Sequence, residues 1–351
     1  MTAFHFGFTR RKSVYLEQFL QKEVHALTDS VILQPWDTVY VWGDAQISPE
    51  QRKGAALVRV EDGLVRSVGL GVLFAQPVSW TFDYQGLHHW GHRTTDLELL
   101  VQSCGSDGPL LARASALRKR IVDEGFTKYN LPDEVLESPF LSKTRKRVLV
   151  VGQVADDAAL RGITTPIKTN MGLLAAARER CPAAEILYRP HPDVAAGARD
   201  GHDDAWKTFA DHRITEGSIV QLLPHVDEVH VLNSLAGFEA LLRNVPVVCY
   251  ANPFYAGWGL TTDAHPLGRR PAASLNQLIA AALIKYPKYR HPRTGQPLQV
   301  EEALDALAEL RQQARSDSPI SKFTHAVVAR IARLADQLRL RRLDRLNRIH
   351  D

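Results

Sequence analysis

Two adjacent carboxylates, Glu61 and Asp62, end an alternating apolar run and stand directly before Gly63 in VRVEDGLVRSVGLG (58–71). A carboxylate held in a site can serve as a general base or as a nucleophile. Neighbouring side chains of a strand point to opposite faces, so the pair does not form an acid dyad inside a regular strand. Both can belong to one site where the strand ends, and Gly63 permits such a turn. The alternative is a solvated turn without chemistry.

A second pair of carboxylates, Asp156 and Asp157, follows the run VLVVGQV (148–154), and an aspartate there can act as a nucleophile. The alternative role is the N-cap of the next helix. His191 and Pro192 follow another strand-like run. A histidine in that place can bind a phosphate oxygen or stabilise a leaving group, and proline fixes the backbone behind it.

Asn233 and Ser234 stand before a helical segment, LAGFEALLRN (235–244). Either side chain can cap that helix, and the free N–H groups at a helix start bind phosphate. A plain cap without a ligand is the alternative. Glu239, five residues beyond Ser234, reaches a ribose hydroxyl only where a ligand extends along the first turns of the helix.

Several common motifs are absent from the sequence. It contains no GxGxxG, Walker or HExxH pattern, which leaves dinucleotide, P-loop and zinc-protease sites without support. Its three cysteines, Cys104, Cys181 and Cys249, have no metal-ligand spacing and are typical of a reducing cytoplasm. We therefore expect no metal site and no cofactor.

The elements that must position these residues alternate between strand and helix. Apolar runs predict strands at 37–43, 55–63, 147–154, 184–192, 227–234 and 245–250. Helical periodicity predicts helices at 109–126, 169–182 and 235–244. This order favours parallel, doubly wound sheets, whose ligands bind outside the carboxyl ends of the strands. The polar residues singled out above follow four of those strands, so we expect them to meet at one site.

The chain of 351 residues is long enough for two domains. A stretch rich in proline and charge, 131–147, predicts the connection between them. We expect an α/β fold with two Rossmann-like domains facing a cleft. The predicted parts are an N-terminal domain at 1–143, a C-terminal domain at 144–315 and a basic tail at 316–351.

The bulk composition, 45% hydrophobic and 23% charged, is typical of a soluble globular protein. The sequence contains no run of eighteen apolar residues and no recognisable secretory signal, so we expect a cytoplasmic location. The segment 326–351 places arginines between apolar residues, which predicts a basic amphipathic helix. Such a helix can rest on an anionic membrane surface or pack on its own protein.

Four stretches together resemble a known family: VEDGLVRSVGLG (60–71), VLVVGQVADDAAL (148–160), YRPHPDVAAGARDG (188–201) and NSLAGFEALLRNVPVVCYANPFYAGWGLT (233–261). They resemble the capsule polysaccharide synthesis family and, within it, the retaining β-Kdo transferase modules of the KpsC and LipA type. The resemblance covers residues 4–310 and is closer to the C-terminal module of the two-module enzymes. It implies a GT-B-like fold and a metal-independent transfer of Kdo (3-deoxy-D-manno-octulosonic acid) from CMP-Kdo to a Kdo-containing or other glycan or glycolipid.

Carried over residue by residue, the resemblance implies a role for each matched position. Asp157 is the nucleophile that expels CMP and forms a covalent ketosyl-enzyme. Glu61 or Asp62 is the general base on the acceptor side, with Asp62 favoured. The C-terminal domain binds the CMP part of the donor through His191, Pro192, Asn233, Ser234 and Glu239. The Kdo carboxylate and hydroxyls are bound by Arg66, Ser67, Lys128, Asn130 and Gln153, in keeping with the bidentate fit of a guanidinium to a carboxylate.

The sequence departs from the family pattern in three ways. Ala159 stands two residues beyond the nucleophile, where the family commonly has serine. GLHHWG (86–91) replaces the family's GIYYD, so the sugar or acceptor contacts around His88, His89 and Trp90 differ. The chain carries one module where the capsule enzymes carry two. This predicts either a separate partner transferase or a different glycan.

Two rival functions stay open. The altered segment 86–91 favours a transferase for another CMP-linked ulosonic or sialic acid. A non-catalytic partner module of a polysaccharide assembly complex would use the basic tail as a membrane contact at the inner face of the cytoplasmic membrane. Nucleic acid is not an expected partner, because no stacking aromatic motif accompanies the arginines.

Overall fold

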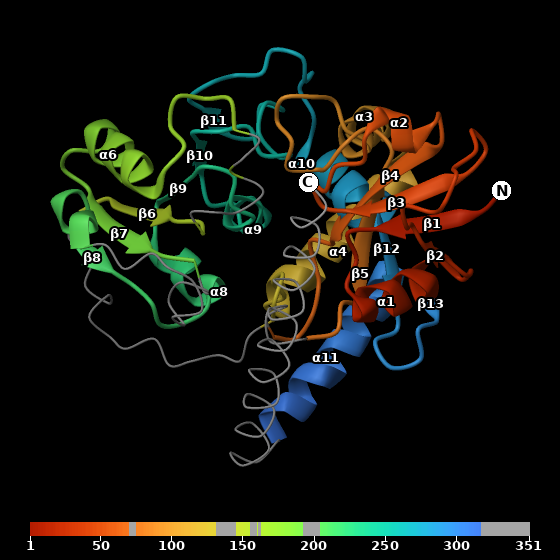
Figure 1. Cartoon of the computed structure of the whole chain (residues 1–351). Helices are drawn as coiled ribbons and strands as arrows, with labels where there is room; N and C mark the ends of the chain where they lie inside the picture. Colours follow the sequence, from red (N-terminus) through yellow and green to blue (C-terminus); the bar gives the residue numbers. More distant parts are fainter. Residues whose placement is uncertain (70–74, 131–144, 155–159, 161–162, 192–203, 317–351) are drawn as a thin grey trace.

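The computed structural model describes the chain except for residues 70–74, 131–144, 155–159, 161–162, 192–203 and 317–351. The described part forms two β-sheets with helices around them (Figure 1), which confirms the predicted α/β class. Most of the predicted connection at 131–147 and nearly all of the predicted basic tail lie outside the described residues. None of the described helices is long and apolar enough to cross a membrane.

The sheet at the left of Figure 1 has six strands in the order β11-β10-β9-β6-β7-β8, all parallel. Its strands are β6 (Arg147–Val151), β7 (Glu185–Arg189), β8 (His212–Arg213), β9 (Glu228–Val231), β10 (Val247–Cys249) and β11 (Thr262–Asp263). Every residue of β6 is buried, as a continuous apolar run predicts for a strand covered on both faces. The helices α6 (Asn170–Arg180) and α9 (Ala236–Leu242) form where the sequence predicts them.

The other sheet has seven strands in the order β13-β12-β5-β4-β3-β1-β2. Its strands are β1 (Ala3–Phe6), β2 (His25–Ala26), β3 (Thr38–Trp42), β4 (Ala56–Asp62), β5 (Ser79–Asp83), β12 (Pro287–Arg290) and β13 (Pro297–Leu298). Strands β2, β1, β3 and β4 are parallel, whereas β5, β12 and β13 join in antiparallel pairs. The prediction of a Rossmann-like first half is therefore wrong for this edge. The turn that joins β12 to β13 is too short for a crossover, so that pair must be antiparallel.

The two sheets are not separate in the chain or in the core. Strands β12 and β13 come from within the predicted C-terminal part, 144–315, yet they pair in the sheet of the N-terminal part. One hydrophobic cluster contains buried residues from around both sheets, among them Leu97, Leu117, Leu149 and Phe238. The boundary at residue 143 stays a prediction, and the sheets share a continuous core across it.

The remaining helices surround and join the sheets (Figure 1). They are α1 (Arg10–Leu20), α2 (Pro49–Arg52), α3 (Asp96–Ser103), α4 (Gly108–Asp123), α8 (Ile219–Leu222), α10 (Leu275–Ile279) and α11 (Val300–Ser316), with a π-helical turn at Ala280–Lys285 and 3₁₀ turns at Asp204–Thr208 and Leu223–His225. Helix α4 matches the prediction for 109–126. Asp107 caps its start by accepting the N–H of Leu110 at 3.0 Å, and Gly125 follows its end with φ +65°.

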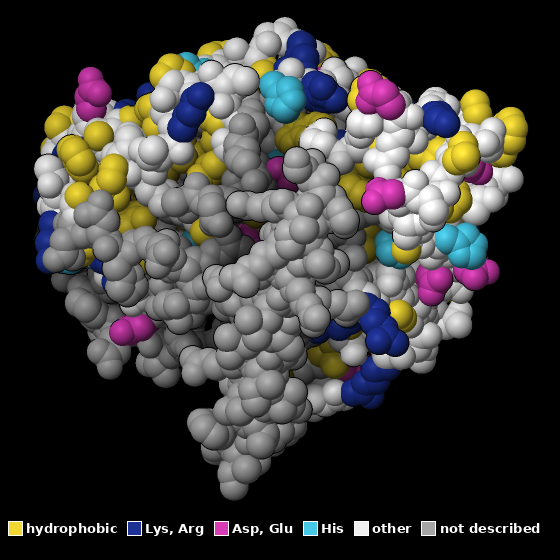
Figure 2. All heavy atoms as spheres, viewed as in Figure 1, with side chains coloured by type: hydrophobic (Ala, Val, Ile, Leu, Met, Phe, Trp, Pro, Cys, Tyr) yellow, Lys and Arg dark blue, Asp and Glu magenta, His cyan; other side chains and the backbone are white. Residues whose placement is uncertain are grey.

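Charged side chains are scattered over the face of the molecule in Figure 2. Basic and acidic groups lie among apolar ones there, and neither sign forms one large patch on the described part of this face. This agrees with a nearly balanced composition of 43 Lys and Arg against 39 Asp and Glu.

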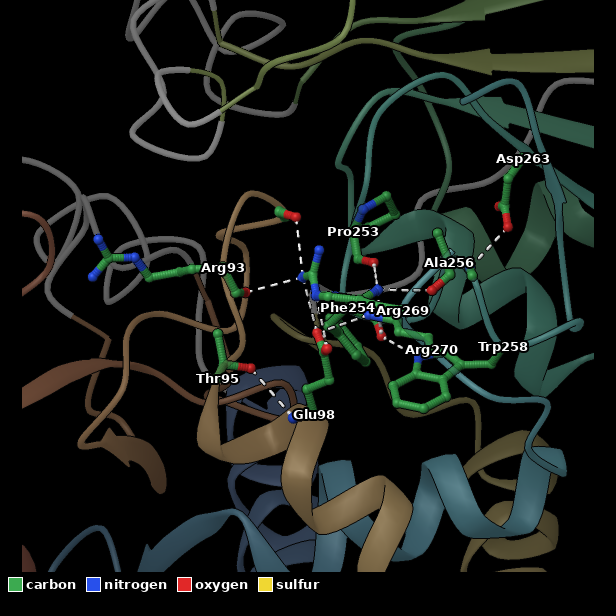
Figure 3. Close-up of polar contacts among 12 residues, drawn as sticks. Arg93, Thr95, Glu98, Pro253, Phe254, Ala256, Trp258, Asp263, Arg269 and Arg270 are labelled. Carbon is green, nitrogen blue, oxygen red and sulfur yellow. Dashed lines mark hydrogen bonds and ion pairs between the residues drawn. The ribbon is translucent and has the colours of Figure 1, made fainter. Parts of the chain in front are cut away.

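A buried ion cluster ties α3 to the chain that follows β10 (Figure 3). The Glu98 side chain is 2% exposed and accepts hydrogen bonds from Arg269 and Arg270, each with a 2.9 Å contact from its Nε. Arg270, also 2% exposed, donates through Nη1 to the carbonyls of Pro253 at 2.8 Å and Ala256 at 2.7 Å. A single carboxylate thereby fixes the segment 253–256 against the helix layer of the other sheet.

Replacing Glu98 by glutamine tests this tie. Glu98→Gln leaves Arg270 buried without its counter-charge, so we expect the free energy of unfolding to fall by about 3–5 kcal/mol. Urea unfolding followed by circular dichroism measures it. Asp123→Asn is the matched control, because it breaks only the exposed Lys119–Asp123 pair and leaves the stability nearly unchanged. Equal losses in the two variants would contradict the assigned role.

Candidate functional site

Three of the predicted site residues, two from the CMP-binding set and one from the Kdo-binding set, lie at one level of the six-stranded sheet. Val151 of β6 is in register with Arg189 of β7 and with Val231 of β9. The residues two positions beyond these three are Gln153, His191 and Asn233. Because the strands are parallel, their carboxyl ends share one edge, and the structure brings the three residues together there.

Hydrogen bonds fix two of them to each other. The Gln153 side chain is buried and accepts the backbone N–H of Asn233 through Oε1 at 2.8 Å. The backbone of Gln153 is held in turn by the Asn170 amide, which accepts its N–H at 2.9 Å and donates to its carbonyl at 2.7 Å. Asn233 also donates through Nδ2 to the carbonyl of His89 at 3.0 Å. This edge of the sheet is thus tied to the segment 86–91.

The helix after Asn233 begins one residue later than the sequence predicts. Leu235 is the N-cap of α9, and no side chain caps it. Ser234 Oγ instead accepts the N–H of Ala236 at 3.3 Å, which stabilises the turn that enters the helix. The Ser234 carbonyl accepts the hydroxyl of Tyr255. His191, two residues after the end of β7, is partly exposed, and Pro192 lies outside the described residues.

The paired carboxylates lie on β4, which continues through Asp62. Glu61 is opposite Thr81 and Asp62 is opposite Trp80 in the antiparallel ladder with β5. The pair thus ends the strand, and β4 falls within the predicted strand at 55–63. Gly63 has no positive φ, so a left-handed turn is not its role. A Cβ there would lie 2.1 Å from Ser79 Oγ, so glycine is required by the close approach of β5.

Glu61 and Asp62 contact each other despite the strand alternation. Glu61 Oε1 turns back and accepts the backbone N–H of Asp62 at 2.9 Å. Asp62 forms a 2.7 Å ion pair with Arg66 Nε through Oδ2 and accepts the indole N–H of Trp80 at 3.1 Å through Oδ1. Both oxygens of Asp62 are therefore oriented by neighbours.

The predicted Kdo-binding residues gather around Arg66. The backbone N–H groups of Arg66 and Ser67 donate to the carbonyl of Lys128 at 3.0 and 3.2 Å. Arg66 Nη1 donates to Ser67 Oγ at 2.8 Å, and Asn130 Nδ2 donates to the Ser67 carbonyl at 3.0 Å. Glu239 joins this group from α9, since its Oε1 accepts the N–H of Lys128 at 3.0 Å. Of the predicted Kdo set, only Gln153 lies with the donor-side residues instead.

Lys12, which no sequence pattern singles out, lies close to the acidic pair in the structure. Lys12 lies in the first turn of α1, where the run RRK reads as solvated charge, and its Nζ is 3.2 Å from the centroid of the Trp42 ring. Burial lowers the pKa of Lys12 to about 8, and the charges of Asp62 and Glu61 oppose this shift. An ammonium so poised can bind an anion and lose its proton near neutral pH.

The pKa values of Glu61 and Asp62 shift in opposite directions. Burial and the charge of Asp62 raise the pKa of Glu61. Burial also opposes the charge of Asp62, but Arg66, Lys12 and Lys128 outweigh it, so the pKa of Asp62 is lowered. For Lys128, burial is outweighed by Tyr129 and the carboxylates, which raise its pKa to about 12. At neutral pH Asp62 is ionised and Glu61 is the group that takes up a proton first.

His88 brings the altered segment 86–91 close to the charged group around Asp62. Its ring packs against His89, Phe254 and Tyr286, with centroids 5.3, 6.0 and 6.2 Å away. His88 Nδ1 is buried and has no hydrogen-bond partner among the described residues. Burial, together with the charges of His89 and Lys128, lowers the pKa of His88 well below its ordinary value, so the imidazole is neutral.

The predicted nucleophile cannot be placed in this arrangement. Asp157, its neighbour Asp156 and Ala159 lie outside the described residues, as does Pro192. The described site thus contains two groups. One is the carboxyl edge with Gln153, His191 and Asn233, and the other is the charged group around Asp62. Two hydrogen bonds, from Asn233 to the His89 carbonyl and from Lys128 to Glu239, join elements of the two sheets around them.

A family model described as capsule polysaccharide biosynthesis protein matches residues 38–289. The capsule polysaccharide modification proteins LipA of Neisseria meningitidis serogroups A and B are each 38% identical over 291 residues, 81% of this chain and 41% of theirs. The lipopolysaccharide-processing protein LpsZ of Rhizobium meliloti is 37% identical over 276 residues, 76% of this chain and 63% of its own. The chain therefore spans less than half of the LipA proteins and under two thirds of LpsZ.

Two solved structures of KpsC transferases are also similar to this chain. The chain is similar to the Thermosulfurimonas dismutans KpsC β-Kdo 2,7 transferase, with a TM-score of 0.74 and 30% identity over 89% of this chain and 100% of that one. It is also similar to the β-Kdo 2,4 transferase of the same KpsC, with a TM-score of 0.73 and 30% identity over 87% and 98% of the two chains.

The link between Lys12 and Asp62 can be tested without any substrate. Asp62→Asn removes the carboxylate that favours the ammonium and leaves burial in place, so the pKa of Lys12 falls below about 8. NMR titration of ¹³C-dimethylated lysines measures this pKa. Asp305→Asn, at an exposed ion pair with Arg120, is the control that leaves Lys12 unchanged. An unaltered Lys12 titration in Asp62→Asn would separate the two groups.

Proposed function

The chain belongs to the capsule polysaccharide biosynthesis family, and from this premise we propose that it is a retaining β-Kdo glycosyltransferase. It moves Kdo from CMP-Kdo to a glycan or glycolipid acceptor, Kdo-containing in the capsule case. The observation that carries the proposal is the group of cations around Asp62. Lys12, Arg66 and Lys128 outnumber the ionised carboxylate they surround, and this surplus suits a sugar that carries a carboxylate of its own.

The donor side of the proposal rests on the edge of the parallel sheet. Ligands of such sheets bind outside the carboxyl ends of the strands, where Gln153, His191 and Asn233 share one level. We assign the CMP phosphate to His191 and Ser234, flanked by Pro192 and Asn233, and the ribose to Glu239. Gln153 then acts mainly by fixing Asn233, because its side-chain oxygen already accepts that residue's N–H.

The proposed reaction has two displacements. The Asp157 carboxylate attacks the anomeric carbon of Kdo, the bond to the phosphate oxygen breaks, and CMP leaves with the electron pair. An acceptor hydroxyl then attacks the same carbon from the face that CMP left, the bond to Asp157 breaks, and the hydroxyl proton passes to the general base. Two inversions give net retention. No step in this sequence requires a metal or a cofactor.

Electrostatics favour Asp62 over Glu61 as the base. Asp62 is ionised and its two oxygens are aimed by Arg66 and Trp80, which is the state that a base must have before it accepts a proton. Glu61, with a pKa raised by burial and by that charge, is the member of the pair that takes up a proton first as the pH falls. Glu61 would then hold the backbone of Asp62 rather than contact the acceptor.

A transferase for another CMP-linked ulosonic or sialic acid is the second candidate. The observation that favours it is His88, a neutral, buried imidazole in the segment that departs from the family pattern. A GT-B-like arrangement of the predicted parts, a partner transferase and a membrane contact through the tail at 316–351 belong to the same proposal. A non-catalytic role would leave the matched charged residues without a purpose.

Intact-protein mass spectrometry after incubation with CMP-Kdo tests the function. We expect the wild type to gain the mass of one Kdo residue and Asp157→Ala to gain none. Asp156→Ala is the matched control, because it removes the neighbouring carboxylate and keeps the nucleophile. Adduct formation with CMP-sialic acid and not with CMP-Kdo would establish the second candidate. If no adduct forms with either donor and no CMP is released with a Kdo-terminated acceptor, both transferase proposals are overturned.

The two adjacent carboxylates are predicted to behave differently in turnover. Asp62→Asn removes the base and lowers kcat for transfer by about 10²–10⁴-fold. Glu61→Gln keeps the side-chain oxygen that accepts the Asp62 N–H, so it retains most of the activity. Steady-state kinetics with a Kdo-terminated acceptor compare the variants, and rates from Glu61→Gln as low as those from Asp62→Asn would assign the base to Glu61 instead.

A further inference from the structure

A second cluster of reactive groups lies at the opposite end of β9 from the site described above. Glu228 is the first residue of β9 and His230 lies two positions on, on the same face of the strand. Cys181, the C-cap of α6, faces them. Cys181 Sγ, a Glu228 oxygen and a His230 ring nitrogen all lie within 4.8 Å of one another.

We propose that Cys181, Glu228 and His230 bind a divalent, thiophilic metal ion, Zn²⁺. Thiolate sulfur, imidazole nitrogen and carboxylate oxygen are the three ligand types that zinc prefers, and three protein ligands leave one position for water. The ion would lie away from the transfer site, because Glu228 is the first residue of β9, and Asn233 and the transfer site lie beyond the carboxyl end of that strand. The inference does not depend on the proposed function.

Each ligand is oriented by a further contact, as in known metal sites. Glu228 Oε2 accepts a hydrogen bond from Lys146, which leaves Oε1 facing His230 Nε2 at 2.7 Å. The other nitrogen of His230, Nδ1, lies 3.2 Å from the hydroxyl of Tyr250. That hydroxyl can donate or accept, so it satisfies either tautomer of His230. The ring can therefore turn its Nε2 lone pair to an ion without leaving Nδ1 unpaired.

The position of Lys146 suits a thiolate ligand. Metal binding requires the Cys181 thiol to give up its proton, which passes to solvent as the sulfur–metal bond forms. Lys146 Nζ lies 4.0 Å from Cys181 Sγ and stabilises the resulting thiolate.

Cations around the cluster determine which metals it accepts. Lys146 and Arg180 both face Glu228, with Arg180 Nε 4.0 Å from Oε1 and its side chain 47% exposed. Their charge disfavours hard ions, such as Mg²⁺ and Ca²⁺, that bind through electrostatic attraction to oxygen. A thiolate bond compensates for this repulsion only with a softer ion, and Arg180 can swing into solvent when the ion enters.

The sequence cannot reveal this site. A zinc pattern is recognised from short spacings between cysteines and histidines, whereas Cys181 is 47 positions before Glu228. The parallel β6–β9 ladder and the end of α6 bring them together. The expectation of no metal site, drawn from spacing alone, therefore does not address this cluster.

Titration of the purified full-length chain with Co²⁺ and Zn²⁺ tests the proposal. We expect one equivalent of Co²⁺ to produce a thiolate-to-cobalt charge-transfer band that Zn²⁺ abolishes, with one proton released per ion in calorimetry. Cys181→Ser loses the band, and Tyr250→Phe weakens binding about 10–100-fold. Cys104→Ala, at a buried thiol outside the cluster, keeps both signals. No binding by the wild type, or an unchanged band in Cys181→Ser, would overturn the proposal.

A measurement on the wild type alone guards against variants that misfold. Cys181 is partly buried, whereas Cys104 and Cys249 are buried, so an alkylating reagent reaches Cys181 first. Mass spectrometry of alkylated peptides is expected to show that Zn²⁺ slows labelling of Cys181 selectively. An unchanged rate at Cys181 with saturating Zn²⁺ would contradict sulfur ligation, whatever the variants do.

Discussion

The buried carboxylate of Glu98 is the interaction on which the arrangement of the two sheets depends. An unpaired charge in that position would be costly, and Arg269 and Arg270 remove the cost only if the chain after β10 lies against α3. The Arg270 guanidinium also satisfies the carbonyls of Pro253 and Ala256, whose backbone makes no regular ladder. A polar network of this kind tolerates one geometry, so it specifies how the layers meet.

The candidate site has an excess of positive charge. Around Asp62 the cations exceed the anions, and burial keeps water from screening them. The lowered pKa of Lys12 and the raised pKa of Glu61 are two results of one cause, since each group loses hydration and is compensated only in part. An arrangement that is incomplete without a further anion is poorly balanced as a resting structure and well suited to an acidic ligand.

Much of the fold could be predicted because its pattern is local. The run 148–151 is apolar throughout, and a strand covered on both faces needs nothing else to be recognised. The polar residues that follow β6, β7 and β9 were found by the same logic. Lys12, Glu98 and the β12 strand were missed because their partners lie far along the chain, and nothing in the residues beside them reports burial. The alternation rule also failed to anticipate that Glu61 folds back onto Asp62.

The pairing of β5 with β12 has a consequence for synthesis of the protein. Pro287 emerges from the ribosome about 200 residues after Asp83, roughly 10–40 s later at ordinary elongation rates. During that interval β5 has one neighbour, β4, and its other edge presents unpaired backbone groups. The nascent chain thus carries an open sheet edge until β12 is made, which makes this edge a natural target for chaperones and for misassociation with other chains.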